Sequence, residues 1–168
     1  IEIKIVKEEK TALRLFEKGE IDLLTTVTSP LSLDDLASLR SKLHLQPIGG
    51  TLFCTFQLDH PYLKHPKLRK ALSLAIDREK IVRHITQLSE ETAHRVLPPV
   101  VMEGKDRALL PPYDPEKARE LFQEALEEMH LSKEGLAAKT PLLFEGNELQ
   151  RRLAQAMQEE WRNCFGVL

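Results

Sequence analysis

The segment from Lys67 to about Gln87 constrains the fold of this chain more than any other. Its apolar residues recur at about 100° per residue, the spacing of one helix face, and charged residues fill the opposite face. Pro66 suits the first helical position, where its missing N–H is harmless. The pattern predicts one long amphipathic helix that buries its apolar face against a second layer.

Four further helices carry start or stop signals. Their predicted ranges are Glu8–Lys18, Leu33–Leu39 capped by Ser32, a helix starting at Asp114–Pro115, and Asn147–Asn163. Asn147 can cap the last of these with its side-chain oxygen, and Gly166 is placed to end it. Trp161, the only tryptophan, falls at a spacing that favours a core position in that helix.

Short runs of alternating apolar residues separate these helices and predict strands. The ranges are Ile1–Val6, Ile21–Leu24, Leu43–Gln46, Thr51–Leu58 and Thr140–Glu145. The turn Pro47–Gly50 favours a hairpin between the third and fourth strands. The proline-containing stretch Leu88–Pro112 shows no period and is predicted to be irregular. Together the elements predict an α/β fold class, an α+β mixed sheet with flanking helices, in one domain over residues 1–168.

Size and charge exclude several classes of protein. The 168 residues are enough for one domain with a core, and the formal net charge is −2. A charge this small gives no electrostatic basis for binding nucleic acid or an anionic membrane surface. Apolar runs stay shorter than the roughly 20 residues that a membrane-spanning helix needs.

The sequence shows no pattern of catalytic or metal-binding residues. His60 and His65 are five residues apart, which is not the i, i+4 spacing of a helical metal site, and we predict solvated loop histidines. Cys54 and Cys164 form no CxxC pair, and a disulfide between them remains open. Asp77–Arg78 is predicted to be a structural ion pair. We therefore predict no catalytic residue, no metal and no cofactor, and a protein that is not an enzyme.

Four segments in order resemble one bacterial family. They are Gly19–Leu23 (GEIDL), His60–Arg78 (HPYLKHPKLRKALSLAIDR), Tyr113–Ala118 (YDPEKA) and Leu149–Gly166, a helix with one tryptophan that ends at glycine. They are similar to segments of the oligopeptide- and dipeptide-binding proteins, extracellular solute-binding family 5, which serve ABC importers. The chain departs from the family at Gln57, where asparagine is common, and at His65, where aspartate is expected.

The resemblance implies one lobe of a type II periplasmic binding protein, and most of its C-terminal lobe, with both ends truncated. In such proteins two lobes close on an extended peptide. The implied partners are a peptide ligand and the permease subunits of an ABC transporter, with no nucleic acid. The implied protein is a periplasmic or extracytoplasmic monomer, and the membrane is reached only through the permease or a lipid anchor outside this chain.

The same resemblance implies two ligand-contacting stretches. One is the predicted strand Thr51–Leu58, where Thr55 matches an inward position of relatives and Gln57 ends the strand. The other is the corner Glu145–Arg151, where Gln150 matches a position used for binding a ligand carboxylate. Asn147 can face the ligand there or serve only as the helix cap. Three alternatives remain open: a non-peptide solute such as nickel, haem or glutathione; a sensor or interaction module; and an enzyme whose catalytic groups lie in missing chain.

Overall fold

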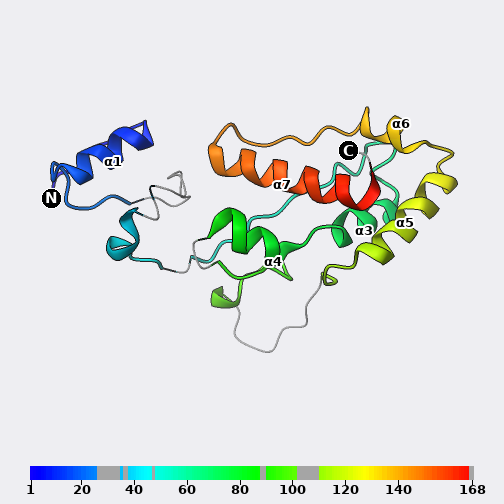
Figure 1. Ribbon diagram of the computed structural model, residues 1–168, viewed down its shortest axis with the longest axis horizontal. Coiled ribbons are helices and arrows are strands. Elements are labelled where there is room, and N and C mark those ends of the chain that lie inside the picture. Colours follow the sequence, from blue (N-terminus) through cyan, green and yellow to red (C-terminus); the bar gives the residue numbers. More distant parts are fainter. Residues whose placement is uncertain (26–34, 36–37, 47, 88–89, 102–109, 167–168) are drawn as a thin grey trace.

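The computed structural model describes residues 1–25, 35, 38–46, 48–87, 90–101 and 110–166. The named α-helices are α1 (Glu9–Glu17), α3 (Pro66–Leu74), α4 (Arg78–Ile81), α5 (Pro115–Glu128), α6 (Lys133–Ala137) and α7 (Glu148–Phe165) (Figure 1). Shorter 3-10 turns span Arg40–Lys42 and Pro99–Val101, and a π-helical turn spans Val82–Thr86. α1 lies at the end of the molecule opposite α5 and α6.

The core forms where α3, α5, α6 and α7 meet. Its buried residues are Leu68, Ala71, Leu72, Leu74, Ala75, Ala118, Leu121, Phe122, Ala125, Leu126, Leu136 and Phe165. Phe122 of α5 stacks on Phe165 of α7 with ring centroids 4.1 Å apart. Trp161 packs against this core and donates its indole N–H to the carbonyl oxygen of Leu72 at 2.9 Å. The predicted core position of Trp161 is therefore confirmed.

The capping signals at Asp114, Gly19 and Gly166 are confirmed, whereas the predicted cap Ser32 lies outside the described residues. The side chain of Asp114 accepts a hydrogen bond from the backbone N–H of Lys117 at 2.9 Å, and Pro115 follows as the first residue of α5. Gly19 after α1 and Gly166 after α7 have φ angles of 72° and 75°, a left-handed conformation that glycine adopts at little cost. Short helix α6, capped by Ser132, was not predicted.

The prediction of one helix over Lys67–Gln87 is wrong. The chain leaves the helix after Leu74 and begins α4 at Arg78. Asp77 is the reason, because its side chain accepts a hydrogen bond from the backbone N–H of Lys80 at 3.0 Å and caps a new helix. The apolar spacing continues in phase across the break, so periodicity alone could not reveal it.

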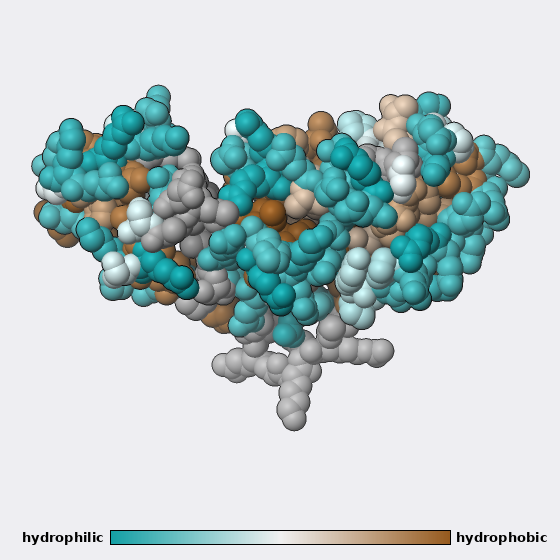
Figure 2. Space-filling view, viewed as in Figure 1, coloured by the Kyte–Doolittle hydropathy of each residue, from teal (hydrophilic) through white to brown (hydrophobic). Residues whose placement is uncertain are grey.

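The five predicted strands are not observed, since no β-strand occurs among the described residues. A strand needs a hydrogen-bonded neighbour, and these segments have none in the described part of the chain. Many of their apolar side chains are instead exposed: Ile3 is 85%, Phe53 65% and Leu143 87% accessible. Figure 2 shows hydrophobic residues, in brown, at the surface among hydrophilic ones. The predicted mixed sheet, including the hairpin over Pro47–Gly50, of which residue 47 lies outside the described residues, is thus not observed in the described structure.

Two other predictions fall partly outside the described residues. The predicted helix Leu33–Leu39 lies largely outside them, although Asp35, Ser38 and Leu39 are helical. The described parts of Leu88–Pro112 are irregular apart from the 3-10 turn, as predicted. Among the helices that are described, none is long and apolar enough to cross a membrane.

Candidate ligand-binding site

The predicted ligand-contacting corner Glu145–Arg151 is built around the N-terminus of α7. The side-chain oxygen of Asn147 accepts a hydrogen bond from the backbone N–H of Gln150 at 2.8 Å. Its amide nitrogen donates to the carboxylate of Glu145 at 3.4 Å. Both polar groups of Asn147 are thus engaged locally, and its capping role is confirmed. The half-buried side chain of Gln150 makes no hydrogen bond to another described residue.

The other stretch, Thr51–Leu58, is extended and runs past the core (Figure 1). Thr55 and Gln57 are both exposed, whereas Phe56 between them is half-buried against the core. This places the two polar side chains on the face away from the core, where a ligand or another part of a larger protein can reach them. Among the described residues no hydrogen bond joins Thr55 or Gln57 to Asn147 or Gln150.

His60, two residues after the first stretch, bonds to Lys139, which precedes the segment that leads to the second stretch. The ring nitrogen Nε2 of His60 lies 3.0 Å from the carbonyl oxygen of Lys139, which directly precedes the segment leading to the α7 corner. Nδ1 of His60 accepts from the backbone N–H groups of Tyr62 and Leu63 at 3.3 and 3.5 Å. The prediction of a solvated loop histidine is therefore wrong for His60. The turn Pro61–Lys64 follows His60 directly and carries backbone N–H groups that a side chain can bond. This turn was the sequence signal that could have suggested a bonded His60.

Lys139 makes two further contacts with the same turn. Its ammonium group donates to the hydroxyl of Tyr62 at 3.2 Å and lies 5.7 Å from the centre of the Tyr62 ring. Tyr62 in turn packs edge-on against His60, with ring centroids 5.5 Å apart. A cation over an aromatic ring is attracted to its electron-rich face. The junction is thus made of His60, Tyr62 and Lys139 together.

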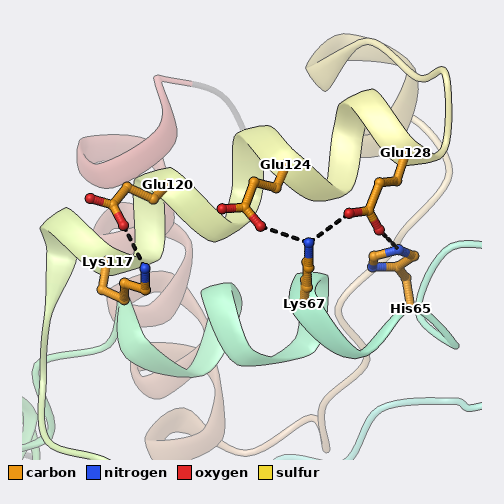
Figure 3. Close-up of polar contacts among 6 residues, drawn as sticks. All are labelled: His65, Lys67, Lys117, Glu120, Glu124 and Glu128. Atoms are coloured by element: carbon orange, nitrogen blue, oxygen red, sulfur yellow. Dashed lines mark hydrogen bonds and ion pairs between the residues drawn. The ribbon is translucent and has the colours of Figure 1, made fainter.

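Charged residues fasten α3 to α5 in a seam shown in Figure 3. The ammonium of Lys67 lies 2.7 Å from Glu124 and 2.6 Å from Glu128. His65 Nε2 lies 3.0 Å from the second carboxylate oxygen of Glu128. His65 is thus half-buried and paired, so the prediction of a solvated histidine is wrong here too. Hydrogen bonding from Lys67 holds the pKa of the Glu128 carboxyl below its usual range.

A second polar cluster lies where α4 meets α7. Glu160, buried on α7, pairs with the ammonium of Lys80 at 2.6 Å, and this hydrogen bond raises the pKa of Lys80. Arg78 donates to the backbone carbonyl and hydroxyl of Ser73 at 3.2 and 2.8 Å. The predicted ion pair between Asp77 and Arg78 is therefore wrong, because each has another partner.

A small cavity of about 240 Å³ opens beside this cluster. Its lining residues are Asp77, Arg78, Glu79, Thr92, His94, Pro112 and Tyr113. Partial burial lowers the pKa of the Arg78 guanidinium and raises that of the Tyr113 phenol. Carboxylates and a guanidinium share this lining, so it has no single charge preference.

Cysteines and metal ligands give no sign of chemistry in the described structure. Cys54 and Cys164 are both free thiols, so the alternative of a disulfide between them is not observed. Burial raises the pKa of the Cys164 thiol, which opposes formation of a reactive thiolate. The part of the chain that the structure describes holds no group of three or more metal-binding side chains.

The whole length of the chain points to one class of protein, a solute-binding protein rather than an enzyme. Residues 1–167 match the bacterial extracellular solute-binding proteins, family 5 Middle, and the chain belongs to this family. The resemblance carried by the four sequence segments is confirmed.

Three curated relatives show what the chain is similar to. It is 29% identical over 171 residues to the oligopeptide-binding protein OppA of Bacillus subtilis, covering 99% of this chain and 31% of the relative. It is 27% identical to the dipeptide-binding protein DppE of the same organism, covering 97% and 30%. It is 28% identical to heme-binding protein A of Haemophilus influenzae, covering 73% and 22%. The chain thus spans less than a third of the length of these relatives.

A solved structure supports the same placement. The chain superposes on a periplasmic oligopeptide-binding protein from Borrelia burgdorferi with a TM-score of 0.73 and 25% identity, covering 96% of this chain and 31% of that one. The predicted likeness to a periplasmic binding protein is therefore confirmed, whereas the strands of the predicted mixed sheet are not seen in the described residues.

Proposed function

We propose that this chain is part of a binding protein that captures peptides between two lobes and delivers them to the permease of an ABC importer, outside the cytoplasm. The observation that carries the proposal is the match along 99% of the chain to an oligopeptide-binding protein. In this proposal the chain forms most of the C-terminal lobe, and residues of the other lobe complete the cleft. A lipid anchor, where the full-length protein has one, would lie outside this chain.

The chain contributes two edges of the proposed cleft. Thr55 and Gln57 are exposed on one extended stretch and offer polar groups to an extended ligand. Gln150 lies in the first turn of the 18-residue helix α7, where free backbone N–H groups and the helix dipole favour a carboxylate. Because the glutamine amide is neutral, it can add a hydrogen bond but no charge. These features suit the terminal carboxylate of a peptide.

The exposed apolar stretches fit the same proposal. Ile1–Val6, Thr51–Leu58 and Thr140–Glu145 carry apolar side chains that lie in solvent in this chain, among them Ile3, Phe53 and Leu143. Strands from elsewhere in the full-length protein would pair with them and bury those side chains. The mixed sheet predicted from the sequence would then form in the complete protein.

Calorimetric titration of the full-length protein with mixed di- to pentapeptides tests the proposal, with residues 1–168 alone as the control. We expect micromolar or tighter binding by the full-length protein and much weaker binding by the isolated chain, which lacks half of the cleft. The absence of peptide binding by both would reject peptides as the ligand.

Haem is the second candidate, because one relative is a haem-binding protein. Titration of the same protein with haem, followed by its absorbance, separates the two ligands. Saturable haem binding without peptide binding would favour that candidate, and screens with nickel and glutathione would follow if neither bound.

A further inference from the structure

We infer that His60, in its neutral form, positions the two ligand-contacting stretches relative to each other and so sets the affinity for ligand. This inference rests on the function proposed above. His60 follows Leu58 by two residues, and Lys139 directly precedes Thr140, where the segment that leads to the corner Glu145–Arg151 begins. One hydrogen bond therefore joins the chain just after the first stretch to the segment that leads into the second.

The hydrogen bonds around His60 determine where its proton lies. Nδ1 accepts from two backbone N–H groups, those of Tyr62 and Leu63, so it carries a lone pair and no proton. The proton is therefore on Nε2, which donates to the carbonyl oxygen of Lys139. Each ring nitrogen has a defined role, and only the neutral Nε2–H tautomer fills both roles.

Protonation would break this arrangement. A second N–H on Nδ1 would face two N–H donors, so the ring would have to turn away from the Pro61–Lys64 turn and release Lys139. The charged group that faces the cluster from the opposite segment is the ammonium of Lys139, held at Tyr62. On its own turn His60 has Asp59 and Lys64 as charged neighbours in sequence.

Both sides of the junction between His60 and Lys139 are attached to the buried core. The position of the junction can therefore determine the positions of the two segments next to it. Tyr62 and Leu63 pack against the main core. On the other side, the backbone N–H of Lys139 and the hydroxyl of Thr140 both bond to the carbonyl of Leu136, which is almost fully buried. Loss of the His60–Lys139 bond would therefore free the following segment toward Glu145 without unfolding the core.

Two substitutions in the full-length protein separate the two roles of the ring. His60→Asn places an acceptor near the position of Nδ1 but cannot reach Lys139. His60→Gln places an amide N–H near the position of Nε2 and restores the donor. His84→Asn, at an exposed histidine of the π-helical turn, is the matched control. The measurements are peptide affinity by calorimetry and amide hydrogen exchange of residues 51–58 and 140–145 by mass spectrometry.

We expect His60→Asn to weaken peptide binding by roughly two- to tenfold, the factor that one net hydrogen bond is worth, and to speed exchange in both segments. His60→Gln should stay close to wild type.

Unchanged affinity and exchange in His60→Asn would overturn the inference, and so would faster exchange throughout the chain, since that would show general destabilisation. If the wild type binds no peptide but exchange still rises in both segments, peptide as the ligand fails while the positioning role of His60 stands.

Discussion

The indole N–H of Trp161 donates to the carbonyl oxygen of Leu72 at 2.9 Å and joins α7 to the last turn of α3. Leu72 is buried, so this carbonyl has little access to water. We expect Trp161→Phe to lower the free energy of unfolding of the full-length protein by about 1–3 kcal/mol, because the acceptor loses its partner while most apolar contact remains. Urea unfolding followed by circular dichroism measures this, and an unchanged unfolding free energy would contradict it.

Lys67→Met tests the charged seam between α3 and α5. The pKa of Glu128 is lowered by its hydrogen bond from Lys67, so that contribution to stability is present above the unfolded carboxyl pKa and lost as acid protonates Glu128. The pKa of Lys67 is raised by its bonds to Glu124 and Glu128, so the contribution is lost again at alkaline pH. Wild type should therefore exceed Lys67→Met in melting temperature most between about pH 5 and pH 10.

Lys117→Met is the matched control for this seam. Lys117 pairs with Glu120 at 2.6 Å within α5 and joins no second helix. We expect a smaller change in melting temperature for Lys117→Met, since a pair between exposed residues one turn apart contributes little. Equal effects of the two substitutions would contradict a role of the Lys67 seam in holding the helices together.

Substitutions at Asn147 and Gln150 should distinguish a structural role, expected for Asn147, from a ligand-binding role, expected for Gln150. Asn147→Ala should lower the free energy of unfolding by about 1 kcal/mol through loss of the α7 cap, and Asn147→Asp should restore it. Gln150→Ala should leave stability within about 0.5 kcal/mol but weaken binding of a peptide carboxylate. Chemical unfolding and calorimetric titration of the full-length variants distinguish the roles. Normal peptide affinity of Gln150→Ala would exclude it as a ligand residue.

The exposed side chain of Ile3 tests the proposed pairing of the apolar stretches. In the full-length protein Ile3→Lys should cost about 2 kcal/mol of stability, the scale of burying one large aliphatic side chain. Glu2→Lys, on the alternate face, should change stability by less than about 0.5 kcal/mol. Equal effects of the two substitutions in urea unfolding would show that Ile3 gains no partner in the complete protein.

Helix ends were predictable because their signals are local. Asp114 with Pro115, Asn147 with the helix that follows it, and Gly166 each act within one turn of the chain, and each was observed in its predicted role. The break before α4 was also encoded locally, by Asp77 as a cap, but the continuous apolar period outweighed it in the sequence. Helix α6 was missed because five residues are too few to show a period.

The strands and most of the site could not be settled in the same way. A strand depends on a partner that is distant in sequence, so the alternation at Ile1–Val6 or Thr140–Glu145 shows only that one face is suited to burial. Within the site, the capping of α7 by Asn147 was predicted. The bond between His60 and Lys139 spans 79 positions, and nothing in the spacing of the sequence indicates it.

The seam in Figure 3 also bears on the register of α3 against α5. Glu120, Glu124 and Glu128 repeat every four residues, so a slip of one helical turn would offer Lys67 a similar pair of carboxylates. Lys117 already pairs with Glu120, which is one of the two carboxylates that Lys67 would contact after such a slip. Lys117, which joins no second helix, thereby makes the alternative alignment of α3 and α5 less favourable. The apolar core holds the two helices together.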